Sequence, residues 1–362
     1  MKKMREELKE IEDQHVRFRL EVGSASNEQR NHDSRETAVV MNDDELVVGR
    51  SEEQMKIMAS LSKNIREKLV IFPIYGIGGI GKTTMAKLLF RDAQFNEYSR
   101  VWVYVSQIFN LKKIGNSIIS QVSKTESQIT DMQLIHTHLA ELLAGKNILI
   151  VLDDIWEDND QFQLDELKKM LKVTEASKII VILTTRNEGI ANNLHTIQPY
   201  KLPLLSNDSC WTIIKQKSDF DSRADKKELG QIGEDIATKC GGVALAAKAL
   251  GNMLRTFTSD EWESVRNSNI WNVSTSEEAH PVLSSLRLTY SYMPAHLRLC
   301  FAYCAIFPKG QKMIMDDLIH HWISLDFIDT THVLSTRQLG EKYIKELLGL
   351  SFFEHSVSSY VP

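Results

Sequence analysis

The sequence predicts an α/β fold built on a parallel sheet, and three observations lead to this prediction. Short apolar runs alternate with stretches of helical periodicity from about residue 68 to residue 205. Two of these runs, 147–154 and 178–185, are almost continuously apolar, as in strands buried on both faces of a parallel sheet. A glycine-rich segment, 76–84, directly follows the first run. We therefore expect strands at Leu69–Tyr75, Val101–Val105, Asn147–Asp154, Lys178–Thr185 and Tyr200–Leu205.

The glycine-rich segment fits the pattern G-x-x-x-x-G-K-[ST], a P-loop whose backbone N–H groups cradle the phosphates of a nucleotide. Its glycines let the backbone approach phosphate oxygens, because they carry no Cβ. The lysine of the pattern would reach the β- and γ-phosphates, and the hydroxyl after it would ligate Mg²⁺. The predicted nucleotide-binding residues of this loop are Gly76, Gly78, Gly79, Gly81, Lys82, Thr83 and Thr84.

The same glycines also spell G-x-G-x-x-G, the pattern of a dinucleotide-binding loop. That alternative needs an acidic residue for the ribose at the end of the second strand, roughly 20 residues on. The predicted second strand ends in Ser106 and Gln107, with no carboxylate, and a dinucleotide fold has no use for Lys82. The sequence therefore favours the P-loop over a dinucleotide site.

Charged residues follow two of the predicted core strands. Asp153, at the end of the strand that starts at Asn147, is expected to hold Mg²⁺ together with Thr83. The neighbouring Asp154 is expected to orient or activate the attacking water, and the alternative for this pair is a simple cap of the next turn. Arg186 follows another core strand, where its guanidinium would reach the γ-phosphate and distinguish ATP from ADP, and the alternative is a surface ion pair. We predict catalytic roles for Asp153, Asp154 and Arg186.

Composition excludes several classes of function. The chain has 43 basic and 48 acidic side chains, for a formal net charge of −5, so no general affinity for nucleic acid is expected. No apolar run is long enough for an integral membrane segment, and the charged N-terminus is no secretory signal. The 4 cysteines are sparse and unpatterned, as in a reducing compartment. We expect a cytoplasmic protein, with association with a membrane surface on activation left open.

The N-terminal segment, 1–22, has apolar residues at alternating spacings of three and four, which is typical of a coiled coil or bundle helix. A dimer zipper and an ordinary amphipathic helix both fit this short segment. Residues 23–44 are polar and read as a linker. Beyond Ser206 the pattern becomes helical.

Several segments, in order along the chain, resemble the coiled-coil class of plant NB-ARC disease resistance proteins, which also carry leucine-rich repeats. The resemblance covers roughly residues 45–350 and rests on Val48–Arg50, Gly76–Thr84, Val101–Gln107, Ile150–Trp156, Leu183–Arg186, Cys240–Ala246 and Leu299–Pro308. It implies the end of a coiled-coil domain at 1–22, a P-loop nucleotide-binding domain at 45–205, a helical subdomain at 206–275 and a partial winged-helix subdomain at 276–362.

The resemblance also implies a switch of plant innate immunity that binds ADP or ATP with Mg²⁺. ADP would hold the three subdomains closed at rest, and exchange for ATP would permit self-oligomerisation. Other implied partners are a pathogen effector or a guarded host protein, bound through regions outside this sequence. By the same resemblance Val48 and Arg50 lie near the adenine and ribose, and Val243, Ala244 and Leu245 lie on the other side of the base.

This sequence departs from the family pattern at three points. Ala244 stands where the family usually has proline, which would rigidify the loop beside the base. A Met-His-Asp triplet that contacts the ADP phosphate is not present, and His355 is not assigned that role. Leucine-rich repeats are also not present, so the chain is expected to be a truncated receptor or a fragment of a longer product.

Three other functions remain open at this stage. A turnover ATPase acting on a client would hydrolyse ATP faster than about one per second when the client is present. A truncated paralogue would bind nucleotide weakly and would not signal by itself. A regulator that reads DNA through its winged helix is disfavoured, because acidic and basic residues are balanced from His280 to Pro362.

Overall fold

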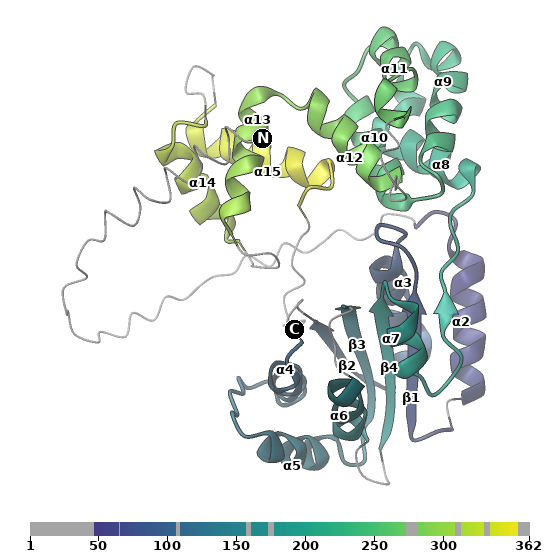
Figure 1. Ribbon diagram of the computed structural model, residues 1–362, viewed down its shortest axis with the longest axis vertical. Helices are drawn as coiled ribbons and strands as arrows, with labels where there is room; N and C mark the ends of the chain where they lie inside the picture. The colour runs from purple at the N-terminus through teal and green to yellow at the C-terminus, as the bar shows by residue number, and fades with distance from the viewer. Residues whose placement is uncertain are drawn as a thin grey trace, which may run out of the picture. The chain divides into compact units, whose positions relative to one another are not determined.

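The computed structural model describes residues 47–64, 66–105, 109–156, 161–172, 177–272, 281–307, 313–328 and 334–353, and element labels follow Figure 1. The predicted N-terminal helix at 1–22 and the predicted linker at 23–44 lie outside the described residues. All of the described ranges fall within a single unit of the chain, 44–362.

Parallel strands form the sheet of the described chain, in the order β2-β3-β4-β1-β5. Helices connect the strands and lie on both faces of the sheet (Figure 1). This architecture confirms the predicted α/β fold. The strands are β1 (Leu69–Tyr75), β2 (Ser99–Tyr104), β3 (Asn147–Ile155), β4 (Lys178–Thr185) and β5 (Tyr200–Lys201). The helices are α2 (Ser51–Asn64), α3 (Lys82–Phe90), α4 (Leu111–Ser123), α5 (Met132–Leu143), α6 (Gln161–Leu171) and α7 (Glu188–Asn193), with a short 3₁₀ turn at Ala93–Phe95.

Alternate residues of each central strand belong to two separate hydrophobic cores. On one face, Ile150 and Val181 pack with apolar residues of α4, α5, α6 and α7. On the other face, Val151 and Ile182 pack with residues of α2 and α3. Both faces of β3 and β4 are therefore buried, which explains why their sequences are continuous apolar runs.

The register of the sheet brings the ends of three strands to one edge. Tyr75 of β1 lies opposite Thr185 of β4, and Leu152 of β3 lies opposite Leu183 of β4. The segments that follow these strands therefore meet at the carboxyl edge, where open α/β sheets bind their ligands. The predicted P-loop is one of these segments.

Pro73 lies in the middle of β1, where a missing N–H donor conflicts with a central strand. The neighbouring odd-numbered residues, Ile71 and Tyr75, direct their backbone groups toward 196 and 202, on the β5 side. Because backbone direction alternates along a strand, the nitrogen of Pro73 faces the same side. Strand pairing with β5 begins only at Ile74, so Pro73 removes no donor from the long β1–β4 ladder.

The fifth strand is shorter than the predicted Tyr200–Leu205 and ends at Lys201. Leu202 still donates its N–H to the Tyr75 carbonyl, but Pro203 has no N–H with which to continue the ladder. Leu205 instead donates its N–H to the carbonyl of Gly242, which leads the chain away from the sheet. Leu205 therefore packs in the core of the following helices, whereas Leu202 stays in the core between the sheet, α2 and α3.

The next helices form their own core, as the helical periodicity after Ser206 predicts. Trp262 and Leu250 are fully buried at its centre. The helices are α8 (Asn207–Ser218), α9 (Lys226–Lys239), α10 (Ala244–Leu254) and α11 (Ser259–Arg266), with 3₁₀ turns at Phe220–Ser222 and Asn269–Asn272.

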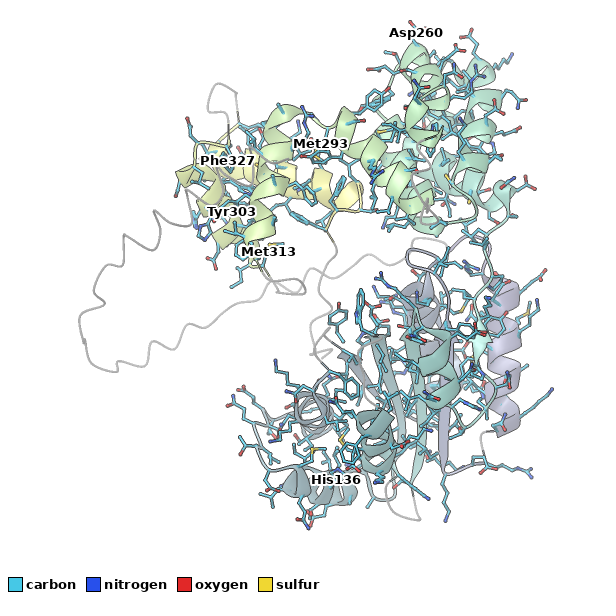
Figure 2. All side chains as sticks on the ribbon, in the orientation of Figure 1. His136, Asp260, Met293, Tyr303, Met313 and Phe327 are labelled. Carbon is cyan, nitrogen blue, oxygen red and sulfur yellow. The ribbon has the colours of Figure 1, made fainter. Side chains whose placement is uncertain are left out.

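A second helical cluster follows, and Figure 2 labels Met293, Tyr303 and Phe327 within it. Its helices are α12 (Pro281–Tyr292), α13 (Ala295–Tyr303), α14 (Met315–Ser324) and α15 (Thr336–Gly349), with a 3₁₀ turn at Cys304–Ile306. Helix α12 belongs to both cores: Leu288 packs in the preceding core and Tyr290 packs against the second. The predicted border at 275/276 therefore precedes a helix that both regions share. None of the described helices is both long and apolar enough to cross a bilayer.

Candidate nucleotide-binding site

The loop between β1 and α3 forms the centre of the candidate site. Gly79 and Gly81 have φ values of +74° and +106°, which L side chains rarely adopt, so the tight turn requires glycine. Gly81 is also the N-cap residue of α3, and no side chain of the described residues caps this helix. The first amides of α3 are therefore available to an anion, at the positive end of the helix dipole.

Lys82 begins α3, and its side chain folds back over the loop. The residue is only 7% exposed, and its ammonium donates hydrogen bonds to the carbonyl oxygens of Gly76 (2.9 Å) and Ile77 (3.0 Å). Burial lowers the pKa of Lys82 to about 8, and the nearby Arg186 cation acts in the same direction. A buried cation beside free backbone amides is suited to a multiply charged anion such as a polyphosphate.

A network of short hydrogen bonds surrounds Asp153, which is buried at the end of β3. The hydroxyls of Thr83 and Thr184 both donate to its Oδ1, at 3.0 and 2.6 Å. The Thr184 hydroxyl oxygen in turn accepts the N–H of Asp154 at 2.8 Å. Asp154 has a left-handed φ of +61°, so the chain turns sharply after the buried carboxylate. The sheet edge and the first turn of α3 thus hold Asp153 in place.

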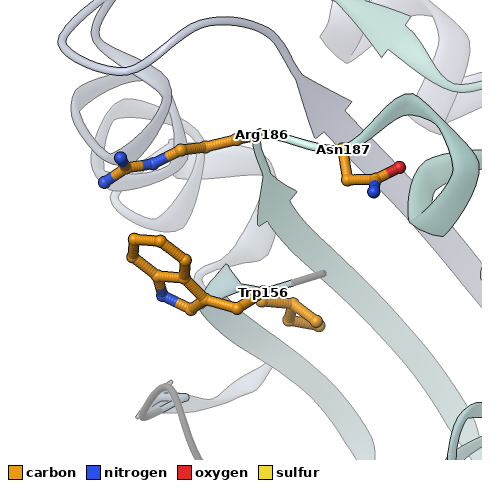
Figure 3. Close-up of a pocket in the computed structure, with 4 residues that line it drawn as sticks. Trp156, Arg186 and Asn187 are labelled. Carbon is orange, nitrogen blue, oxygen red and sulfur yellow. The ribbon is translucent and has the colours of Figure 1, made fainter. Parts of the chain in front are cut away.

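Arg186 follows β4 and lies at the rim of the P-loop. Its Nε is 3.7 Å from Oδ1 of Asp154, and its guanidinium carbon lies 4.5 Å from the ring centroid of Trp156. Together with Ile155 and Asn187, Trp156 and Arg186 line a small pocket beside the loop (Figure 3). The structure therefore brings Asp153, Asp154 and Arg186 together with the P-loop, as the sequence predicts.

Arg50 is 4% exposed and connects two segments that meet behind the P-loop. Its guanidinium donates to the carbonyl of Ile80 at 2.7 Å and to that of Pro203 at 2.8 Å. These bonds anchor the loop to the segment that leads into the helical region. Val48 is half-buried two residues earlier, and its place beside a nucleotide base stays a prediction.

The N-terminus of α10 contacts the P-loop directly. Leu245 donates its backbone N–H to the carbonyl of Gly79 at 3.0 Å. A Cβ added at Gly79 would lie 2.9 Å from Cβ of Leu245 and 3.2 Å from Cγ2 of Val282 in α12. Val243 is buried, and Ala244 occupies the first position of α10. Residues far apart in the sequence thus converge on one glycine of the loop.

The residues at this edge fit a magnesium-bound nucleotide. The Thr83 hydroxyl and the Asp153 carboxylate, 3.0 Å apart, are the hard oxygen ligands that Mg²⁺ prefers. Lys82 and the uncapped start of α3 supply positive charge beside them. Thr84 is exposed on α3, and its predicted contact with the nucleotide stays a prediction.

Sequence reasoning did not anticipate the hydrogen bonds of Thr184 or the contact of Trp156 with Arg186. Both lie in segments that the pattern singles out, but their contacts depend on how β3 and β4 pair. A hydroxyl residue near the end of a strand that neighbours the Asp153 strand is the signal that could have identified Thr184. The contact of α10 with Gly79 has no local sequence signal, because it joins residues that lie far apart along the chain.

Comparison with known proteins agrees with this geometry. A model of the NB-ARC domain matches residues 50–223, which include the P-loop, Asp153 and Arg186. A model of the disease resistance protein winged helix domain matches residues 306–361. The chain belongs to the NB-ARC family. Its P-loop, its buried carboxylate and the arginine after β4 all lie within the matched NB-ARC region and form the candidate nucleotide-binding site at the sheet edge.

Curated NB-ARC relatives are longer than this chain. Disease resistance protein RGA2 of Solanum bulbocastanum is 38% identical over 328 residues, which cover 88% of this chain and 33% of the relative. Disease resistance RPP13-like protein 4 of Arabidopsis thaliana is 30% identical over 305 residues, which cover 82% of this chain and 35% of the relative. The chain thus spans about a third of the length of these relatives.

A solved structure with a similar fold is that of a signal transduction ATPase with numerous domains from Pyrococcus horikoshii, which has a tetratricopeptide repeat sensor. It superposes with a TM-score of 0.50 at 14% identity, over 86% of this chain and 40% of that one. At this identity the likeness supports the NTPase fold of the NB-ARC chain and nothing more specific.

Proposed function

We propose that this chain is the nucleotide switch of a plant disease resistance protein, closed with ADP and active with ATP. The observation that supports the proposal best is the hydrogen bond from the Leu245 N–H to the Gly79 carbonyl. It places the start of a helix from the following region on the loop that would hold the phosphates. A ligand that changes the conformation of this loop would therefore also change the packing of α10 and α12 against it.

Each site residue has a definite role in this proposal. Lys82 and the first amides of α3 bind the β-phosphate, and Thr83 and Asp153 hold Mg²⁺, which neutralises phosphate charge when bound. Asp154 orients water, and Arg186 contacts the additional phosphate of ATP. ATP hydrolysis serves only to return the switch to its ADP state, and we expect a slow ATP turnover. The names of the relatives motivate the assignment to plant immunity, with cytoplasmic localisation, self-oligomerisation and effector or host-protein contacts as parts of the same proposal.

The test is to identify and quantify the nucleotide that copurifies with the chain, in the parent and in Lys82→Ala. The parent is expected to retain close to one adenine nucleotide per chain, mostly ADP, and the variant to retain almost none. Lys87→Ala, at a half-buried lysine in the last turn of α3, is the matched control and should retain the parental amount. A folded parent that binds neither ADP nor ATP at millimolar concentration would contradict the proposal.

The rival functions give other results in the same preparation. A client ATPase would turn over faster than about one ATP per second once its client is added. A truncated paralogue without independent signalling would bind nucleotide only weakly and would lose it during purification. Slow turnover together with tightly retained ADP separates the switch from both.

A further inference from the structure

The indole of Trp156 and the guanidinium of Arg186 stack at the edge of the candidate site. The guanidinium carbon is 4.5 Å from the ring centroid, well within the roughly 6 Å range of a cation–π contact. Trp156 comes directly after β3 and Arg186 directly after β4, so the pairing of these two strands creates the contact. Figure 3 shows the extended arginine side chain lying across the indole.

The other neighbours of Arg186 direct it toward the P-loop. A Cβ added at Gly78 would lie 3.4 Å from Nη1 of Arg186, so the guanidinium lies against the loop backbone. The Asp154 carboxylate, 3.7 Å from Nε, lies near the middle of the side chain. The Arg186 side chain is nevertheless 51% exposed, and its guanidinium lies between the indole contact and the loop backbone at Gly78 without being enclosed.

A long, half-exposed arginine loses rotamer freedom when it binds a phosphate. A rigid aromatic surface beneath it removes part of that loss before the ligand arrives. The indole is well suited to this role, because tryptophan gives the strongest cation–π contact of the aromatic side chains. The guanidinium keeps its hydrogen-bond donors free, since a stack uses its face and leaves its edge for an anion.

We propose that Trp156 is a positioning residue that holds Arg186 beside Gly78, and so raises the affinity of the site for ATP relative to its affinity for ADP. The inference rests on the proposed nucleotide function. Removing the indole weakens ATP binding, because Arg186 must then be ordered by the ligand. It leaves ADP binding unchanged, because ADP lacks the phosphate that Arg186 contacts.

The experiment measures the Kd for ATP and for ADP, with Mg²⁺, in the full chain. In Trp156→Leu the Kd for ATP should increase about threefold to fivefold, with the Kd for ADP constant. Trp156→Phe, which keeps an aromatic face, should fall between this variant and the parent. In an Arg186→Ala background, Trp156→Leu should have no further effect on the ratio of the Kd for ATP to the Kd for ADP, since the two residues act through one contact.

A matched control is Trp271→Leu, because Trp271 also lies under a cation, that of Lys239 at 5.5 Å, but in the helical region. This variant should lose stability without any change in the ATP-to-ADP ratio. Tryptophan fluorescence gives a second readout that does not depend on Trp156→Leu. ATP and ADP should change tryptophan emission differently in the parent, and Trp156→Phe should abolish this difference.

The measurements distinguish a failure of the proposed nucleotide function from a failure of the inference about Trp156. A parent that binds neither nucleotide overturns the proposed function. A parent that binds both, with an ATP-to-ADP ratio that Trp156→Leu leaves unchanged, overturns the role of Trp156 alone. If Trp156→Leu does not fold, Trp156→Phe replaces it. A Trp156→Phe variant with the parental ratio of Kd values, and with the parental difference in emission between ATP and ADP, overturns the inference. An equal effect of Trp156→Leu with and without Arg186 also overturns it.

Discussion

Thr184 donates a 2.6 Å hydrogen bond to Oδ1 of Asp153, and its hydroxyl oxygen accepts the N–H of Asp154 at 2.8 Å. One buried hydroxyl thus joins the ends of β3 and β4 and holds both carboxylate residues of the candidate site. Both the carboxylate orientation and the sharp turn at Asp154 depend on a side chain from the neighbouring strand.

Thr184→Val should therefore damage both stability and metal binding. The change keeps the shape of the side chain but leaves the part-buried Asp154 N–H without its acceptor, at a cost of about 1 kcal/mol in the free energy of unfolding. The Mg²⁺ concentration needed for tight nucleotide binding should increase as well, because Asp153 loses an orienting donor. Denaturant unfolding and nucleotide titrations at several Mg²⁺ concentrations measure the two effects. Thr184→Ser keeps the hydroxyl and should lie close to the parent; equal damage in both variants would contradict this role.

The affinity for nucleotide should fall as the pH rises above about 8. Burial lowers the pKa of Lys82 to about 8, so the free protein loses this cation above that pH. A bound polyphosphate favours the charged form, so binding at higher pH takes up a proton. The Kd for ADP should then rise by up to about tenfold per pH unit. Titrations between about pH 7 and pH 9.5 test this, with Lys82→Arg as the control, because arginine stays charged and its profile should be flat.

The stability of the nucleotide-free protein should change in the opposite direction through the same residue. The unfolded chain holds the Lys82 proton up to its ordinary pKa of 10.5, whereas the folded chain releases it near 8. Between these values the unfolded state binds more protons, so the contribution of Lys82 to stability rises with pH. Denaturant unfolding of the parent and of Lys82→Met across this window measures it as a difference. A difference that stays constant with pH would show that the lysine titrates normally.

Gly79→Ala should break the contact between the P-loop and α10. The added Cβ would lie 2.9 Å from Cβ of Leu245, in a backbone conformation that alanine rarely adopts. Gly81→Ala is the matched control, because its backbone is also left-handed but its Cβ would meet nothing within 4 Å. Hydrogen exchange of the Leu245 amide, which donates to the Gly79 carbonyl, is the measurement. It should become faster in Gly79→Ala only; similar acceleration in both variants would assign the effect to loop strain.

Much of the site could be predicted from sequence, because its parts are local patterns. The spacing of glycines before Lys82 is a property of one loop, and the apolar run before Asp153 predicts a strand buried on both faces. Because β1, β4 and β3 lie next to one another in this order as parallel strands, their carboxyl ends meet at one edge of the sheet. The position of Arg186 follows from the same geometry.

The remaining features depend on tertiary contacts. The early end of β5 follows from Pro203 and from the hydrogen bond of Leu205 to Gly242, a partner outside the sheet. The roles of Thr184 and Trp156 require the register between β3 and β4, which strand propensity alone does not supply. The packing of α12 in two cores likewise depends on which neighbours meet each of its faces.

Ala244→Pro should stabilise the protein. Ala244 is the first residue of α10, where proline is favoured because the helix makes no use of that N–H. Val243 before it is extended, with φ −95° and ψ 114°, as a residue preceding proline must be. The reduced freedom of the unfolded chain should then raise the free energy of unfolding by about 0.4–1 kcal/mol.

Thermal and denaturant unfolding measure this gain, and Ala249→Pro in the buried interior of α10 is the control. An interior proline removes a helical hydrogen bond and clashes with the preceding turn, so this variant should lose about 3 kcal/mol or more. ADP affinity should also rise in Ala244→Pro if residues 243–245 border the base, since the loop is then ordered before binding. Because only the first turn of a helix accepts proline without loss, a lower stability for Ala244→Pro would mean that α10 begins before Ala244.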